Sequence, residues 1–339
     1  MARTLIIAEA GVNHNGSMQM AKQLIDIAVE AGADYVKFQT FISENVISRK
    51  AKKAEYQVQN TGDAEESQLE MVKKLEFNEE QHLELIAYCK QKNIKFLSTP
   101  FDLDSVELLK KFNLDFFKIP SGEITHLPYL KKIAAIGKPV VLSTGMCYLG
   151  EVEWAVNQLI AGGLTRDMIT ILHCNTEYPT PMEDVNLSAM LTIRDALKTP
   201  VGYSDHTLGI EIPIAAVAMG AVFIEKHFTI SRTLDGPDHP ASLEPHELKA
   251  MVTTIRNIEK ALGDGIKQPS ASERKNIAIA RKSIHYSTNL SKGHLLMEKD
   301  FIMKRPGTGI SPIFIENFIG KKLTADVFED DMLQLSDIN

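Results

Sequence analysis

Residues 4–40 read TLIIAEAGVNHNGSMQMAKQLIDIAVEAGADYVKFQT, and the fold is inferred outward from this stretch. The apolar runs at 4–11 and 35–40 are typical of buried strands, and residues 18–32 between them have the spacing of an amphipathic helix. The same alternation recurs along the chain, giving eight strand–helix units in residues 1–265. Because the strands are almost continuously apolar, we expect a parallel sheet that is covered on both faces.

Eight strand–helix units in this length predict an α/β fold of the (β/α)8 type, a TIM barrel. A doubly wound open sheet is the alternative. It usually has fewer strands, and no Gly-x-Gly-x-x-Gly sequence follows the first strand here.

The pattern changes after Gly265. Residues 266–282 are polar and lack the strand–helix alternation, so we interpret them as a linker. Residues 283–339 contain short apolar pieces broken by turns, which predicts a small β-rich domain. With fewer than 60 residues its core is marginal, so we expect it to dock on another surface.

The composition excludes several classes of protein. The formal net charge is −7, and no run of lysine or arginine is long enough to indicate a nucleic-acid surface. No apolar run has the length of a membrane span. The three cysteines, Cys89, Cys147 and Cys174, are too scattered for a disulfide framework. We therefore expect a cytoplasmic protein without nucleic-acid or membrane partners.

Polar residues gather at the carboxyl ends of the predicted strands, where the active site of a TIM barrel lies. They are Glu9, Lys37, Gln39, Ser98, Thr99, Lys118, Ser121, Glu123, Ser143, Thr144, His173, Asn175, Ser204, Asp205, His206, Glu225, Lys226 and His227. Thr176, Glu177 and Tyr178 follow in one turn, and Asp235 and Asp238 lie in a Gly/Pro-rich loop. Unpaired buried charges are costly, so such a set indicates ligand binding or mutual pairing.

Lys37 and Lys118 would both point into one barrel mouth. Two lysines there suit a multiply charged anion such as a phosphorylated carboxylic acid, with the hydroxyls of Ser121, Ser143 and Ser204 beside them. Lysine–glutamate pairs that only close the barrel layers are the alternative.

His206 and His227 end two neighbouring predicted strands. Each alone is typical of a hydrogen-bonded core histidine, but together two imidazoles suit a divalent metal such as Mn2+, Co2+ or Zn2+ in an open site. Glu225 shares a strand face with His227, so we expect it to orient that ring. His14, His173 and His239 remain competing ligands, whereas a nucleophilic pair of Cys174 with its neighbour His173 is disfavoured because adjacent strand residues face opposite sides.

Ten stretches in order together resemble the bacterial N-acetylneuraminate (sialic acid) synthase family. They are AEAGVNHNGS, VKFQT, STPFD, KIPSGE, LSTGM, LHCNTEYPTP, GYSDHT, IEKHFT, GPDHPAS and KRPGTGISP. The resemblance implies a TIM barrel joined to an antifreeze-like (SAF) C-terminal domain, in a domain-swapped homodimer. It also implies condensation of phosphoenolpyruvate with N-acetylmannosamine and water, giving N-acetylneuraminate and phosphate with C–O cleavage and a divalent metal, Mn2+ first and Mg2+ or Co2+ as options.

The resemblance also assigns roles to residues of this chain. His206 and His227 match metal ligands, and Glu9, Glu123 and Asp238 match residues near the reacting atoms. Lys37, Lys118, Ser121 and Ser204 match phosphoenolpyruvate contacts, with the lysine for the phosphate left open. Asn175, Thr176 and Tyr178 match further substrate contacts, and Arg305 matches an arginine supplied by the partner's small domain. No residue is assigned in the insert from Asn60 to Ser67.

Three other functions stay open. A synthase of legionaminic or pseudaminic acid would use a 6-deoxy diacetamido hexose, although KAEYQ, QNTG and ESQLEM in the insert favour the sialic acid enzymes. A Schiff-base aldolase would use Lys37 or Lys118. A non-catalytic barrel carrying an ice- or carbohydrate-binding module is disfavoured by the density of ionisable strand-end residues.

Overall fold

The computed structural model describes residues 3–54, 57–58 and 66–339. The chain divides into two compact units, Met1–Asp264 and Gly265–Asn339, and each is described by itself. No helix among the described residues is both long and apolar enough to cross a bilayer.

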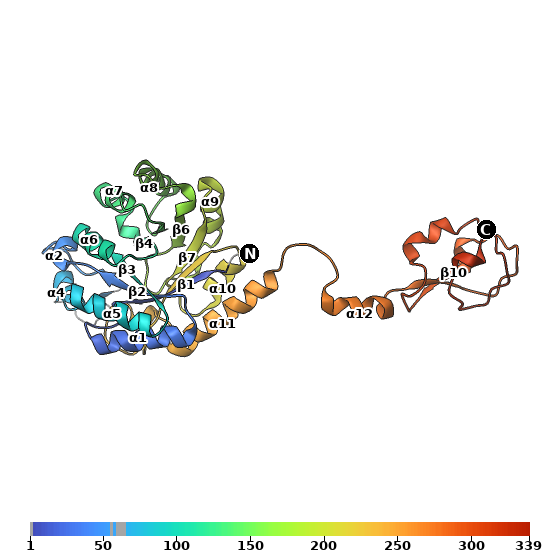
Figure 1. The fold of residues 1–339 in the computed structure, drawn as a ribbon, viewed down its shortest axis with the longest axis horizontal. Helices are drawn as coiled ribbons and strands as arrows, with labels where there is room; N and C mark the ends of the chain where they lie inside the picture. Colours follow the sequence, from blue (N-terminus) through green and yellow to red (C-terminus); the bar gives the residue numbers. More distant parts are fainter. Residues whose placement is uncertain (1–2, 55–56, 59–65) are drawn as a thin grey trace. The chain divides into compact units, whose positions relative to one another are not determined.

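The first unit is the predicted TIM barrel, in which eight parallel strands are ringed by helices (Figure 1). The strands are β1 (Leu5–Gly11), β2 (Tyr35–Thr40), β3 (Lys95–Pro100), β4 (Phe117–Ile119), β5 (Val140–Ser143), β6 (Ile169–Cys174), β7 (Val201–Asp205) and β8 (Phe223–His227). Their order is β3-β2-β1-β8-β7-β6-β5-β4, so the first and last strands pair, and β3 and β4 at the ends of this order are in contact.

Each strand leads to at least one helix. The helices are α1 (Met18–Ala31), α2 (Ser43–Val46), α4 (Gln68–Lys73), α5 (Glu79–Gln91), α6 (Leu103–Lys111), α7 (Leu127–Ala134), α8 (Leu149–Ala161), α9 (Ser188–Leu197), α10 (Glu211–Ala218) and α11 (Pro245–Leu262). Helix α1 shows how the sequence sets these bounds. The Ser17 side chain accepts from the Met20 amide at its start, and Gly32 ends it in the left-handed conformation with φ 82°.

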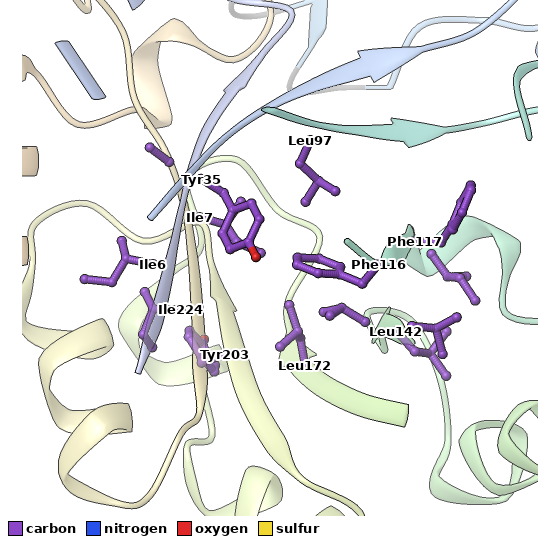
Figure 2. Packing of buried hydrophobic residues seen from close by; sticks show 14 of the residues in the cluster. Ile6, Ile7, Tyr35, Leu97, Phe116, Phe117, Leu142, Leu172, Tyr203 and Ile224 are labelled. Carbon is purple, nitrogen blue, oxygen red and sulfur yellow. The ribbon is translucent and has the colours of Figure 1, made fainter. Parts of the chain in front are cut away.

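The core of the barrel follows from the alternation of side chains along each strand. Ile7, Leu97, Leu142 and Leu172 are fully buried in one cluster, together with Tyr203 (Figure 2). Burying side chains of this size stabilises the fold by roughly 1.5–3 kcal/mol each. These apolar residues hold the sheet rigid, so the polar residues at the strand ends have fixed positions.

The second unit has a small core of its own. Strands β9 (Ser283–Tyr286) and β10 (Phe301–Lys304) pair antiparallel, and Ile284, Tyr286 and Leu333 are fully buried against them. Isolated bridges elsewhere in the unit extend this β character. It matches the small β-rich domain expected from the sequence.

One element was not expected. Helix α12 (Ala271–Ala280) occupies most of the segment that we interpret as a linker, and its residues are largely exposed. Ser270 and Glu273 form a capping box at its start. That Ser-x-x-Glu signature was available in the sequence.

Candidate active site

The strand register brings the polar residues together at the carboxyl ends of the strands. Glu9 on β1 is the pairing partner of Lys37 on β2 and also of His227 on β8. Ser204 on β7 pairs in the same way with Glu225 on β8. Residues more than 200 positions apart in the chain are therefore side by side on the inner face of the barrel.

Four buried ionisable side chains form what we call the inner charge cluster: Glu9, Lys37, Lys118 and Glu225. Lys37 Nζ lies 2.7 Å from Glu9 Oε2 and 3.6 Å from Glu225 Oε2. Lys118 Nζ lies 3.4 Å from Glu225 Oε1, which also accepts a 3.0 Å hydrogen bond from the Ser204 hydroxyl. Glu225 thus lies between the two lysines.

Burial and charge act in opposite directions on this cluster. Burial raises the pKa of Glu9 to about 7, against the pull of Lys37. Burial also raises the pKa of Glu225, but Lys118 and Lys37 outweigh it and leave that pKa below its ordinary value. Burial lowers the pKa of Lys118 despite the nearby Glu225 carboxylate. Glu225 is therefore the fixed anion, and Glu9 can carry a proton near neutral pH.

Hydroxyl groups surround the two lysines. Lys118 Nζ donates to Ser143 Oγ at 2.7 Å, and Lys37 Nζ donates to Thr99 Oγ1 at 2.8 Å. The Ser121 hydroxyl oxygen accepts from the Gly145 amide at 2.9 Å. The two lysines and the hydroxyl-bearing residues Thr99, Ser121 and Ser143 line one cavity of about 470 Å3 at the mouth of the barrel, which we call the main chamber. Its cations and hydroxyls suit the oxygens of a phosphate and a carboxylate.

The two histidines border the same chamber. The His206 and His227 ring centroids are 5.5 Å apart, and the Tyr178 ring stacks on His206 at 4.0 Å. His206 Nδ1 donates to the Asn175 carbonyl oxygen, so its Nε2 keeps a lone pair. Burial lowers the pKa of His206 to about 4, which keeps the ring neutral.

His227 has a buried Nδ1 without a hydrogen-bond partner among the described residues. Asp238 Oδ2 is 3.9 Å from this nitrogen, too far for a hydrogen bond. Gly11 passes close by with φ 53°, and a Cβ there would lie 3.1 Å from the ring. The backbone leaves room for the imidazole only because this position is glycine.

These observations fit the divalent metal expected from the sequence. Two neutral imidazoles, one with an unused Nε2 and one with an orphaned Nδ1, are suitable donors for Mn2+, Co2+ or Zn2+. Within the described part of the chain, no three His, Cys, Asp or Glu side chains are placed to hold a metal. The pair would therefore bind weakly and leave coordination positions open.

The competing histidines have other partners. His173 bonds the Val185 carbonyl through Nε2 and does not line the chamber. Its neighbour in the chain, Cys174, does line it. His239 Nδ1 bonds the Thr229 hydroxyl, and His14 stacks on the Phe77 ring at 4.0 Å. His206 and His227 are thus the pair that shares the main chamber.

The structure brings most of the predicted site residues into the main chamber. Those that line it are Glu9, Lys37, Lys118, Ser121, Thr176, Tyr178, Ser204, His206 and His227. The other four predicted residues lie elsewhere. Glu123 is hydrogen-bonded to His126 Nδ1, and Asn175 accepts the Glu177 amide through its side-chain oxygen at 2.7 Å. Asp238 borders an adjacent pocket, and Arg305 belongs to the second unit, where its Nε donates to the Ala280 carbonyl.

The expected role of Glu225 was wrong in detail. It faces the chamber as the alternation predicted, but it bonds Ser204 and approaches the two lysines in place of orienting His227. Two lysines at one barrel mouth indicated that an opposite charge lies near them, but not which carboxylate supplies it. In the insert from Asn60 to Ser67, where no contact was assigned, residues 60–65 lie outside the described part.

Comparisons with known proteins identify the family and the fold of this chain. The model of the NeuB family matches residues 24–267, and that of the SAF domain matches residues 281–339. Among solved structures, N-acetylneuraminic acid (sialic acid) synthetase from Leptospira borgpetersenii superposes with a TM-score of 0.72 at 38% identity, covering 81% of this chain and 90% of that one.

Two similar relatives carry a different product in their names. N,N'-diacetyllegionaminic acid synthase of Campylobacter jejuni is 57% identical over 334 residues, which are 98% of this chain and 100% of the relative. The enzyme of the same name from Legionella pneumophila is 47% identical over 324 residues, covering 95% and 91%. The sugar expected from the sequence therefore needs revision.

Proposed function

This chain belongs to the NeuB family, and from that premise we propose that it condenses phosphoenolpyruvate with a 6-deoxy diacetamido hexose and water. The products would be N,N'-diacetyllegionaminic acid and inorganic phosphate. The observation that carries the reaction class is the pairing, in one chamber, of two lysines with two neutral histidines. The chain is more similar to the diacetyllegionaminic acid synthases, at 57% and 47% identity, than to the N-acetylneuraminic acid synthetase, at 38%. This difference favours the diacetamido hexose over N-acetylmannosamine, which the insert stretches had favoured.

The lysines and hydroxyls would bind phosphoenolpyruvate. Lys37 and Lys118 lie on either side of Glu225, so a phosphate and a carboxylate on one small molecule can each take one ammonium group. Ser121, Ser143 and Ser204 supply further donors around the same cavity. Charge-assisted contacts of this kind fix the anion's orientation as well as its affinity.

The reaction forms one carbon–carbon bond and breaks one carbon–oxygen bond. C3 of phosphoenolpyruvate bonds to the aldehyde carbon of the sugar, whose oxygen takes a proton. Water adds to C2 and loses one proton, and the resulting C2 hydroxyl loses the other as phosphate leaves with the electrons of its bond to C2, which leaves a ketone at C2. The two protons go to the former aldehyde oxygen and to the departing phosphate. Glu9, whose pKa burial raises to about 7, would accept a proton from that water.

His206 and His227 would hold the divalent metal, which when bound supplies Lewis-acid polarisation of the sugar's aldehyde oxygen. The chain's own part is to present two neutral rings. The hydrogen bond from His206 Nδ1 to Asn175 fixes one tautomer, and Tyr178 packs against both rings. Fixed rings keep the aldehyde next to the bound phosphoenolpyruvate.

A homodimer remains part of the proposal, with Arg305 acting on the partner's barrel as the resemblance implies. Mixed dimers of Arg305→Ala and Lys118→Met subunits test it. They should recover activity that neither variant has alone, because one barrel then has both its lysine and a partner arginine. Mixtures that stay inactive would contradict this arrangement.

Phosphate release on a substrate panel tests the function directly. The protein, phosphoenolpyruvate and Mn2+ are incubated with the diacetamido hexose or with N-acetylmannosamine, with and without a chelator. We expect release with both sugars, faster with the diacetamido hexose, and loss of release with chelator. No release with any 2-acetamido hexose would refute the proposal. Faster turnover of N-acetylmannosamine would instead indicate that N-acetylmannosamine is the substrate, as first expected from the sequence.

A further inference from the structure

A second cavity of about 260 Å3, which we call the side pocket, opens beside the main chamber. The two cavities share Gln39, Phe101 and Tyr178 in their walls. Gln39 also reaches Glu9 with a 3.5 Å hydrogen bond between Nε2 and Oε1. A ligand whose reacting end lies in the main chamber can therefore extend into the side pocket.

One wall of the side pocket is apolar. Its residues come from the segment after β2 and from the region of helices α2 and α4, which lie against each other (Figure 1). They are Phe41, Val46, Ile47, Met71, Val72 and Leu75. Phe41 and Leu75 are buried in one small cluster, with Val72 and Phe101 packed against it. This wall is suited to a methyl group and offers no partner to a hydroxyl.

The polar groups of the side pocket are unevenly distributed along it. Tyr178 and Asp238 lie at the end near the histidines, since Tyr178 contacts both rings and Asp238 Oδ2 is 3.9 Å from His227 Nδ1. The amides of Gln57 and Gln68 also line the pocket, and Gln68 Nε2 donates to Gln57 Oε1 at 3.3 Å. Side-chain amides both donate and accept, as an acetamido group does.

We propose that the side pocket selects the sugar: its apolar wall receives the C6 methyl group, and Gln68 receives the second acetamido group. This inference rests on the proposed function, which places the aldehyde carbon at the histidines. The rest of the sugar must then extend away from the lysines, toward the wall of α2 and α4. N-acetylmannosamine would leave its C6 hydroxyl without a partner against that wall.

The expected selectivity is moderate. An apolar pocket that must reject an added hydroxyl discriminates by about a hundredfold in kcat/KM, and a single methylene is worth about 10- to 200-fold. We therefore expect kcat/KM for the 6-deoxy diacetamido hexose to exceed that for N-acetylmannosamine by between about ten- and a hundredfold.

Val72→Thr tests the methyl site, because it adds a hydroxyl at nearly constant volume. Three sugars are compared: the 6-deoxy diacetamido hexose, N-acetylmannosamine and 6-deoxy-N-acetylmannosamine. We expect the ratio of kcat/KM between the third and the second sugar to fall about tenfold. Val29→Thr, at a half-buried valine of α1 away from both cavities, is the matched control and should leave every ratio unchanged.

Gln68→Leu tests the acetamido site independently. It should raise KM for the diacetamido hexose about tenfold or more, because a buried amide then loses its partner. It should leave KM for 6-deoxy-N-acetylmannosamine and for phosphoenolpyruvate within about twofold. A Gln68→Asn variant, which keeps the amide on a shorter stem, should recover part of the loss.

The outcomes separate the side pocket from the proposed function. Selective turnover of the diacetamido hexose by wild type, with sugar ratios unchanged in Val72→Thr and Gln68→Leu, would overturn the side-pocket assignment and leave the function standing. A wild type that releases no phosphate with any of the three sugars would overturn both. Ratios that shift as predicted in the two variants, with Val29→Thr unchanged, would support the assignment.

Discussion

The two faces of strand β8 differ in how completely their buried charged and polar groups are paired. On the outer face, Lys226 is completely buried with Asp205, and its ammonium also bonds the Thr207 carbonyl. On the inner face, Glu225 is 3.4 and 3.6 Å from its two lysines, and His227 Nδ1 has no hydrogen-bond partner among the described residues. The outer charges are saturated by the fold, whereas the inner ones border a cavity. Incomplete pairing next to a cavity indicates a ligand site.

The largest expected effect is on the inner face. His227→Ala removes one of the two imidazoles, so metal-dependent phosphate release should fall about 10^3- to 10^4-fold. The unfolding midpoint should stay near that of wild type, because the ring has no hydrogen bond to lose at Nδ1. His173→Ala on β6 is the control. It should keep metal-dependent phosphate release, since that ring bonds the Val185 carbonyl and does not line the main chamber. Full activity in His227→Ala would contradict the claim that the inner face of β8, unlike its outer face, carries a ligand site.

The next largest effect is on the outer face. Lys226→Met leaves Asp205 buried without its cation, which should lower the free energy of unfolding by about 3 to 5 kcal/mol. The single tryptophan, Trp154 on α8, reports unfolding of the barrel by fluorescence in urea. Replacing both partners, Lys226→Met with Asp205→Leu, should recover most of the loss. A Lys226→Met protein as stable as wild type would show that this pair is not structural.

A smaller effect concerns the pH dependence of stability and a buried histidine on one of the outer helices. His82 on α5 bonds the Thr40 hydroxyl and the Asn78 carbonyl, and burial lowers its pKa. The stability it contributes is present above its unfolded pKa of about 6.5 and is lost as pH falls below that value toward the folded pKa. The loss reaches at most about 1.4 kcal/mol per pH unit.

His82→Asn should flatten this dependence, because the amide does not titrate. Urea unfolding at several pH values between 7.5 and 5 measures it. His246→Asn, at an exposed residue of α11, should keep the wild-type slope. Identical slopes in all three proteins would contradict the buried neutral state of His82.

The fold and the face of the strand on which each strand-end residue lies could be predicted, because both depend on local periodicity. Apolar runs fixed the strands, and the two-residue repeat placed Glu225 and His227 on one face with Lys226 on the other. The barrel rule then located the site at the strand ends.

What could not be predicted depends on contacts between distant segments. The position of Glu225 between Lys37 and Lys118 requires three strands in register, and no spacing in one strand encodes it. The apolar wall of the side pocket comes from residues 41–47 and 71–75, in and around α2 and α4, where the strand–helix rhythm is interrupted. Asp238 borders the side pocket with its Oδ2 3.9 Å from His227 Nδ1, and its expected place near the reacting atoms stays a prediction.

Binding of phosphoenolpyruvate to Lys118→Met and Lys226→Met, followed as the shift in thermal midpoint with Mn2+ present throughout, tests the central claim most directly. At about 100 times its Kd, the ligand should raise the midpoint of wild type by roughly 5 °C. We predict that Lys226→Met melts lower but keeps this shift, whereas Lys118→Met melts near wild type and loses it. An undiminished shift in Lys118→Met would contradict the claim that the inner lysines are there for the ligand.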